Sequence, residues 1–276
     1  MAAASVIVRA RDSEGTIERA LRALRAQTVP VEIIVVDSGS TDATLEIARR
    51  YSDCVIEIAP EQFTFGRALN VGARAASEPI NFALSAHCAP GRTDWVERSL
   101  AHYEHREVAG TAGYRAPGPA GQHGLVLQDL SVLRADPFWG YSNTAGSWRA
   151  EVWERFPFHE QLPTAEDREW SWRVLEAGWS IAMDPQLEVL SEHRTRLGPL
   201  HLYRRQRNES RVIATIADRH PYTVRRALRD WWRPAPIAGR SPTRIRSSPW
   251  HIASIAGRYS GVRQARSGRH STISSL

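Results

Sequence analysis

Lysine is absent from this chain of 276 residues, because all 36 basic residues are arginine. A chain without lysine cannot form a Schiff base with a substrate through a lysine amine. It also lacks the lysine with which a P-loop holds phosphate groups. Both classes of lysine chemistry are therefore excluded.

Cysteine is scarce, and long apolar runs are missing. Cys54 and Cys88 are the two cysteines of the sequence, a number that predicts a reducing compartment rather than a disulfide framework. No run of about 18 apolar residues occurs, so we expect no transmembrane helix. The first apolar strand begins within a few residues of Met1 and leaves no room for a signal peptide. We therefore expect a cytoplasmic protein.

Positive charge is concentrated near the end of the chain. Residues 1–218 contain 24 arginines and 29 acidic residues, a net charge of −5, whereas residues 219–276 contain twelve arginines and one acid, a net charge of +11. We expect two parts: a mildly acidic globular domain, 1–218, and a basic C-terminal extension, 219–276. Residues 237–248 are rich in Pro, Gly, Ser and Arg and predict a linker, and residues 249–264 predict one more helix.

The most informative segment surrounds Asp37. The apolar run Ile33–Val36 predicts a buried strand, and the residues from Leu45 onward predict a helix. Asp37 therefore lies on a turn at the carboxyl end of a strand, the edge at which open α/β sheets bind ligands. An acid there can accept hydrogen bonds from a ribose or a base. An ordinary turn in which Thr41 or Asp42 caps the helix is the alternative.

Strands and helices alternate over the first hundred residues. Strand patterns at residues 5–12, 33–36, 54–58 and 80–84 are followed by helical patterns at 14–27, from 45–48 onward, at 66–76 and at 93–103. This order predicts an α/β fold with a mostly parallel sheet and helices on both faces. Pro117, Pro119 and several glycines predict loops over residues 108–150. Further along, helices are expected at 149–155 and 165–177, and strands at 179–183 and 187–190.

These motifs together resemble family 2 glycosyltransferases of the GT-A fold. The matching residues are Asp12 in the loop after the first strand, Ala26-Gln27-Thr28 at the end of the first helix, and Asp37 to Asp42 in the turn after the second strand. The resemblance runs from about residue 4 to about residue 193. It implies a Rossmann-like GT-A domain that transfers a sugar, with inversion, from a nucleotide diphosphate to an acceptor hydroxyl. The donor is expected to be UDP-linked, and the acceptor a sugar, a lipid-linked glycan or a small natural product.

The resemblance assigns the nucleoside to strand ends. It places the donor against Ala10, Arg11 and Asp37, with Arg67 contacting the base or the diphosphate. A solvated helix start is the alternative for Arg67. The pair Arg204 and Arg205 could close over the diphosphate, since arginine matches phosphate oxygens, or could lie on a solvated helix face.

The chain departs from the family where the fourth strand ends. Ser85-Ala86-His87 stands in place of the Asp-x-Asp motif that holds Mg²⁺ or Mn²⁺ in the family. His87 with His193, which matches a downstream metal-contacting histidine, could hold a metal weakly. Alternatively the enzyme needs no metal, and Ser85, His87 and arginines contact the phosphates directly. His87 as a purely structural residue is the third interpretation.

Two adjacent acids supply the candidate catalytic groups. By resemblance, Asp167 removes the proton of the acceptor hydroxyl, and Glu166 orients the site or binds the acceptor. The structural alternative is that acids at a helix start favour the positive end of the helix dipole.

Further alternatives concern the function and the partners of the chain. A nucleotidyltransferase is the alternative enzyme, although residues 9–15 lack the Gly-rich loop that such enzymes carry. A catalytically silent protein that binds nucleotide sugars or nucleic acid is the alternative without activity.

The basic extension has tryptophans interleaved with arginine: Trp231, Trp232 and Trp250. This pattern suits peripheral contact with anionic lipid heads. Packing against the acidic domain is the alternative. We do not expect nucleic acid as a partner, though charge alone does not exclude it.

Overall fold

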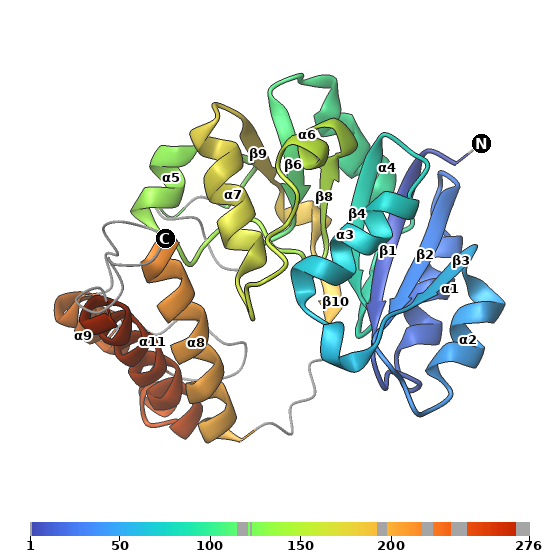
Figure 1. Cartoon of the computed structure of the whole chain (residues 1–276). Coiled ribbons are helices and arrows are strands. Elements are labelled where there is room, and N and C mark those ends of the chain that lie inside the picture. Colours follow the sequence, from blue (N-terminus) through green and yellow to red (C-terminus); the bar gives the residue numbers. More distant parts are fainter. Residues whose placement is uncertain are drawn as a thin grey trace. The chain divides into compact units, whose positions relative to one another are not determined.

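The computed structural model describes residues 2–114, 121, 123–191, 198–216, 223–232 and 242–268. They divide into two compact units (Figure 1). Among the described residues the first unit holds 2–133 and 138–191, and the second holds 134–137 and those from 198 onward. The expected domain boundary between residues 218 and 219 stays a prediction.

An eight-stranded sheet forms the centre of the first unit, in the order β3-β2-β1-β4-β8-β6-β9-β7. β1 is parallel to β2 and β4, β2 is parallel to β3, and β6 is parallel to β9, whereas β8 and β7 run antiparallel to their neighbours. The sheet is thus mostly parallel, as the sequence predicts. The strands are β1 (Ala4–Ala10), β2 (Val31–Asp37), β3 (Cys54–Glu57), β4 (Ile80–Ser85), β6 (Val108–Ala112), β7 (Val126–Gln128), β8 (Gly146–Arg149) and β9 (Ser180–Met183).

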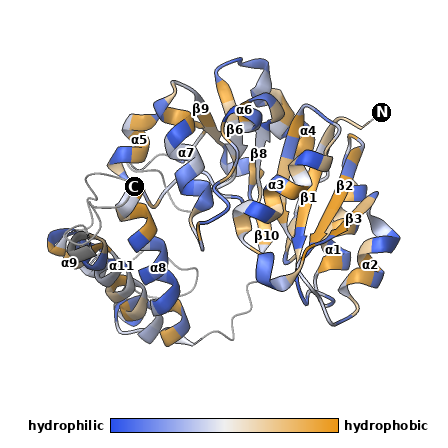
Figure 2. Cartoon of the chain, viewed as in Figure 1, coloured by the Kyte–Doolittle hydropathy of each residue, from blue (hydrophilic) through white to orange (hydrophobic). Residues whose placement is uncertain are grey.

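Helices cover both faces of this sheet because successive strand residues point to opposite sides. On β1, Val6 and Val8 pack in one apolar cluster with α1, α2 and α4, and Ile7 packs in a second cluster with α3, α5, α6 and α7. Figure 2 shows the hydrophobic strands between these helices. The helices are α1 (Ile17–Arg25), α2 (Thr44–Tyr51), α3 (Phe65–Ala75), α4 (Trp95–Ala101), α5 (Leu130–Ala135), α6 (Ala150–Arg155) and α7 (Glu166–Glu176).

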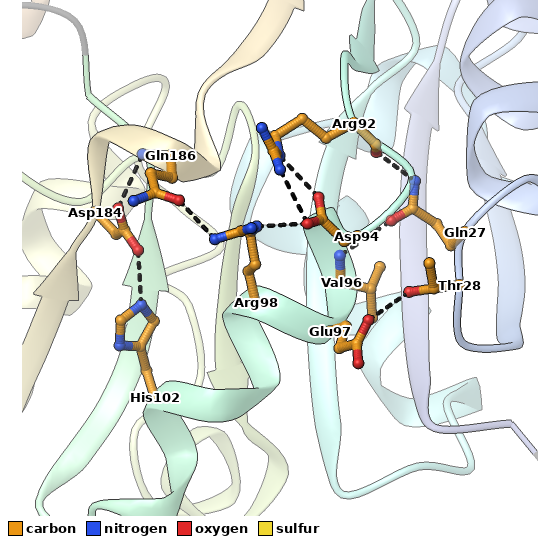
Figure 3. Close-up of polar contacts among 10 residues, drawn as sticks. All are labelled: Gln27, Thr28, Arg92, Asp94, Val96, Glu97, Arg98, His102, Asp184 and Gln186. Carbon is orange, nitrogen blue, oxygen red and sulfur yellow. Dashed lines mark hydrogen bonds and ion pairs between the residues drawn. The ribbon is translucent and has the colours of Figure 1, made fainter.

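Gln27 and Thr28, which belong to the family motif, have a structural role (Figure 3). The side chain of Gln27 accepts a hydrogen bond from the amide of Val96 at 3.0 Å and donates one to the carbonyl of Arg92 at 3.0 Å. The hydroxyl of Thr28 donates to Glu97 at 2.8 Å. These bonds join the end of α1 to the start of α4.

The expectation of loops over residues 108–150 is wrong where β6, β7, α5 and β8 lie. Pro117 and Pro119, on which it rested, lie outside the described residues. β6 is fully buried, yet its sequence, VAGTA, is made of small residues that hide a strand pattern. A side chain at Gly110 would collide with the carbonyl oxygen of Ser147 on β8 and with the ring of Trp170. Close strand and helix packing therefore requires the glycine that made this segment look like a loop.

A separate two-stranded sheet pairs β5 (Cys88–Pro90) with β10 (Val189–Ser191). Ser191 lies opposite Cys88 in this antiparallel pair. At β10 the chain therefore returns to the strand that follows the Ser85-Ala86-His87 segment.

The second unit is helical, as expected. It contains α8 (Pro199–Ile216), α9 (Val224–Trp232), α10 (Pro242–Arg246) and α11 (Pro249–Gly268). α11 approaches α8 closely, since a side chain at Gly257 or Gly261 would collide with backbone oxygens of α8. The linker expected at 237–248 is wrong for residues 242–246, which are helical, and residues 237–241 lie outside the described residues. In the described parts of the chain, no helix has the length and hydropathy that crossing a membrane requires.

Candidate active site

The Asp37 turn lies at the carboxyl edge of the parallel strands, where Ala10 pairs with Asp37 and Arg9 with Ser85. Asp37 is fully buried. One carboxylate oxygen accepts hydrogen bonds from the amides of Gly39 at 2.9 Å and Ser40 at 2.8 Å, and the other accepts one from the Ser40 hydroxyl. The carboxylate of Asp37 therefore holds its own turn rigid, and its contact with a nucleoside stays a prediction.

Asp12 joins this turn to the loop that follows β1. Its Oδ1 accepts a hydrogen bond from the amide of Thr41 at 2.9 Å, and its own amide donates to the Ser40 hydroxyl at 2.9 Å. Asp12 adopts a left-handed backbone conformation with a φ of 43°. The loop after β1 and the turn after β2 are thus joined by hydrogen bonds into one polar surface at the edge of the sheet. Arg11, in the loop after β1, is exposed.

Arg67 lies in the first turn of α3. The Thr64 hydroxyl caps this helix by accepting a hydrogen bond from the amide of Arg67 at 3.0 Å. The guanidinium of Arg67 forms no hydrogen bond or ion pair with the residues that the structure describes, and the side chain is half-buried. The neighbouring Phe65 ring lies 5.4 Å from the guanidinium carbon of Arg9, so the start of α3 borders the end of β1.

Arg9 is the centre of the site. Its Nη2 donates to the carbonyl of Asn143 at 2.6 Å and to the Ser85 hydroxyl at 3.2 Å, and its Nη1 lies 3.7 Å from Oε1 of Glu166. The side chains of Arg9 and Glu166 are 9% and 7% exposed. One buried cation therefore joins the ends of β1 and β4 to the loop before β8 and to the start of α7.

Glu166 is a buried acid beside a second acid. Burial, and then the negative charge of Asp167, raise the pKa of Glu166 to about 7, whereas Arg9 and a hydrogen bond from Asn143 act in the opposite direction. Asp167 is half-buried, and its Oδ1 accepts a hydrogen bond from the amide of Arg168 at 2.8 Å. The two carboxylates thus differ: one is enclosed and paired, and the other is partly exposed.

The backbone before these acids is strained. Ala165 has a φ of 62° and a ψ of 26°, a left-handed conformation. For a residue other than glycine this conformation costs roughly 1 kcal/mol or more, and such residues gather at functional sites. The kink directs the chain into α7 just ahead of Glu166 and Asp167.

A cavity of about 330 Å³ lies at the same edge of the sheet, between the loops that precede β8 and β10 and the residues that follow β6. Its walls offer an aromatic ring and hydroxyl groups. Ser142 and Thr144 flank Asn143, which contacts both Arg9 and Glu166. The lining residues are Gly113, Tyr114, Ser142, Thr144, Ala145, Leu187, Glu188, Val189 and Ser191.

The sequence matches the family model "Glycosyl transferase family 2" over residues 5–158, which is more than half of the chain. The chain belongs to glycosyl transferase family 2. Glycosyltransferase AglE of Haloferax volcanii is 29% identical over 191 residues, which cover 64% of this chain and 62% of AglE. The chain thus matches less than two thirds of the length of that relative.

Two solved structures show the fold of this family 2 chain. A mannosyltransferase from Pyrobaculum calidifontis, in complex with GDP-Man and Mn²⁺, has a TM-score of 0.62 at 18% identity and covers 100% of this chain and 76% of its own. S. aureus TarS 1–349 in complex with UDP has a TM-score of 0.56 at 18% identity and covers 96% of this chain and 91% of its own. The GT-A fold that the sequence predicts is therefore confirmed.

The Ser85-Ala86-His87 segment ends β4 and enters the turn before β5. In the described part of this family 2 chain, no three His, Cys, Asp or Glu side chains gather to hold a metal ion. His193 lies outside the described residues, so its pairing with His87 stays a prediction. The Arg9 guanidinium also lies 3.2 Å from the Ser85 hydroxyl, where it would repel a second cation. The described residues do not fit a carboxylate site for Mg²⁺ or Mn²⁺.

Arg204 and Arg205 belong to α8 in the second unit. Both are exposed, and Nε of Arg205 lies 3.7 Å from Oε1 of Glu209, one helical turn further on. Their contact with a donor diphosphate stays a prediction.

Sequence reasoning missed Arg9 and Asn143. Arg9 did carry a signal, since it is a charged residue at the end of the otherwise apolar run Val6–Val8 and points to the same face as Ile7. Asn143 carried none, because it lies in a loop and reaches Arg9 across 134 residues of sequence.

Proposed function

We propose that this chain is a glycosyltransferase that moves a sugar from a nucleotide diphosphate to an acceptor hydroxyl. Family membership supports the reaction class. The observation that carries the proposal is the pairing of Glu166 with Arg9, beside Asp167, at the edge where α/β proteins bind ligands. This arrangement places the buried carboxylate of Glu166 next to the partly exposed carboxylate of Asp167.

Asp167 is the proposed general base. In an inverting transfer the acceptor oxygen forms a bond to the anomeric carbon while the bond to the diphosphate breaks and its electron pair leaves with the phosphate. The acceptor proton goes to the base, a step that contributes roughly 10²–10⁴-fold. Asp167 suits this role because it is partly exposed, whereas Glu166 is enclosed by Arg9 and Asn143. Glu166 then orients the start of α7.

The donor is proposed to be a UDP-sugar. The nucleoside would lie along Ala10, Arg11 and the Asp37 turn, with Arg67 turned toward the diphosphate. The absence of any partner for the Arg67 guanidinium among the described residues supports this role. The TarS structure contains UDP, whereas the Pyrobaculum mannosyltransferase contains GDP-Man, so the nucleotide must be tested directly.

The transfer is proposed to need no metal. The matching mannosyltransferase contains Mn²⁺, but this chain has Ser85 and His87 in place of acidic ligands and a fixed guanidinium beside Ser85. Neutralising the departing diphosphate then falls to His87 and to arginine side chains, whose geometry matches phosphate oxygens.

The cavity beside Asn143 is the proposed acceptor site. The hydroxyls of Ser142 and Thr144 can exchange hydrogen bonds with sugar hydroxyls, and the ring of Tyr114 offers a face against which a sugar can pack. Its volume of about 330 Å³ lies within the range of small-molecule sites. Asn143 lies between Ser142 and Thr144 of the cavity lining, and its side chain donates a hydrogen bond to Glu166. It therefore connects the cavity to the acidic residues at the start of α7.

A donor screen tests the proposal. Purified protein is incubated with UDP-, GDP- and dTDP-sugars and a panel of sugar, lipid-linked and small aromatic acceptors, and the free nucleoside diphosphate is measured. We expect release from a UDP-sugar. Failure of every donor with every acceptor would exclude the transferase. Release of pyrophosphate instead would indicate a nucleotidyltransferase, and tight binding without any release would indicate a silent binding protein.

A further inference from the structure

Helix α9 presents an apolar face that the chain leaves exposed. Val224, Ala227, Leu228 and Trp231 recur at the spacing of one helix face. No residue of this helix is buried, and Val224 and Leu228 are 55% and 54% exposed. An amphipathic helix normally buries such a face, so this one is available to a partner.

Helix α11 supplies a second apolar wall. Ile252, Ala256 and Tyr259 lie on its exposed side, while Gly257 and Gly261 pack against α8 on the other. Together α9 and α11 enclose a groove of about 410 Å³, here named the α9–α11 groove. It is lined by Val224, Ala227, Leu228, Trp231, Ile252, Ile255, Ala256 and Tyr259.

Arginines and tryptophans surround the groove. Arg225, Arg229 and Arg263 are exposed, and the guanidinium carbon of Arg246 lies 5.3 Å from the ring centre of Trp232. Trp232 is 65% exposed. Asp230 is the single acid from residue 219 to the end of the sequence. The apolar groove is therefore set in a strongly positive surface.

We propose that the α9–α11 groove docks on a membrane surface that carries anionic lipids. Apolar side chains enter the boundary between headgroups and acyl chains, and arginines contact the lipid phosphates. Tryptophan and tyrosine favour this boundary because one end of each ring is apolar and the other polar. None of the described helices is long and apolar enough to span a bilayer.

Nucleic acid suits this surface less well. Its backbone would satisfy the arginines and its bases could stack on Trp231 or Tyr259, but the aliphatic part of the groove would gain no partner. A membrane uses the apolar and the cationic groups at the same time. The proposal does not depend on glycosyl transfer, since binding is measured without a sugar donor.

Co-sedimentation of the full chain with vesicles tests the proposal. One set of vesicles contains phosphatidylcholine alone, and the other contains equal parts of phosphatidylcholine and phosphatidylglycerol. We expect binding to the mixed vesicles and little to the neutral ones, with weaker binding at high salt. Equal binding to both sets, or binding to neither, would overturn the proposal.

Variants separate the two kinds of contact. Arg225→Ser and Arg229→Ser should each weaken binding to the mixed vesicles by about fivefold, and Leu228→Ser with Ile252→Ser should weaken it further. Arg106→Ser is the matched control, because Arg106 is an exposed arginine in the first unit. All five side chains are exposed, so circular dichroism should show unchanged folding. An equal loss with Arg106→Ser would sink the idea.

The same variants distinguish a membrane from two other possible occupants of the α9–α11 groove. If the groove instead binds a second copy of the chain, light scattering will show a dimer that Leu228→Ser dissociates. If it binds nucleic acid, a DNA fragment will compete fully with vesicles, and Leu228→Ser with Ile252→Ser will leave vesicle binding intact. Either result overturns the membrane proposal.

Discussion

Nη1 of Arg9 lies 3.7 Å from Oε1 of Glu166, and both side chains are more than nine-tenths buried. The first residue belongs to β1 and the second to the start of α7. A buried ion pair of this kind is weak support for stability in itself, but removing one partner leaves an uncompensated charge.

Above about pH 8, Arg9→Met should destabilise the fold by about 3 kcal/mol, because Glu166, whose pKa is about 7, is ionised there and loses its buried cation. Urea denaturation in this alkaline range measures the free energy of unfolding. Arg9→Met combined with Glu166→Gln should recover part of this loss, since neither charge then remains. A double-mutant cycle with no coupling between the two positions would show that the pair is incidental. Arg67→Met is the control and should change stability little.

Stability should fall as the pH rises from about 4.5 to about 7. The pKa of Glu166 is raised from 4.5 to about 7, so between these values the folded chain holds a proton that the unfolded chain releases. The contribution of Glu166 to the free energy of unfolding should decrease by about 3 kcal/mol over this window. The difference between wild type and Glu166→Gln, measured by urea denaturation along the pH series, isolates this group. Parallel curves would contradict the raised pKa.

Asp167→Asn should lower kcat by about 10²–10⁴-fold while the KM for the donor changes little, because the general base is lost and donor contacts remain. Initial rates of nucleoside diphosphate release measure both constants. Glu169→Gln is the matched control, as Glu169 lies on the same helix but pairs with Arg173 at 2.5 Å. If Asp167→Asn keeps full turnover, Asp167 is not the base.

Turnover should survive EDTA, because a guanidinium lies beside Ser85 and, among the described residues, no three His, Cys, Asp or Glu side chains gather to hold a metal ion. The rate of diphosphate release is compared before chelation, after it, and after adding Mn²⁺. His87→Ala should slow the reaction equally with and without Mn²⁺ if His87 contacts phosphate directly. A rate that EDTA abolishes and Mn²⁺ restores would instead assign His87 to a metal.

The parallel half of the fold was predictable because its signals are local. Apolar runs such as Ile33–Val36 mark buried strands whatever lies around them, and the amphipathic pattern of α1 appears within nine residues. β6 has no such local pattern. Its small residues are buried only because β8 and Trp170 pack against Gly110, and no local pattern reports such a contact.

The sequence by itself determined the α/β class, the turn at Asp37, the adjacent acids at 166 and 167, and the basic character of the C-terminal segment. These depend on the order of side chains along the chain. The tertiary structure alone decided that Asp37 holds its own turn, that Arg9 is buried against Glu166, and that Asn143 contacts both. The contacts of Arg9 and Asn143 join residues far apart in sequence. Burial, which raises the pKa of Glu166, exists only once the sheet and its helices have packed.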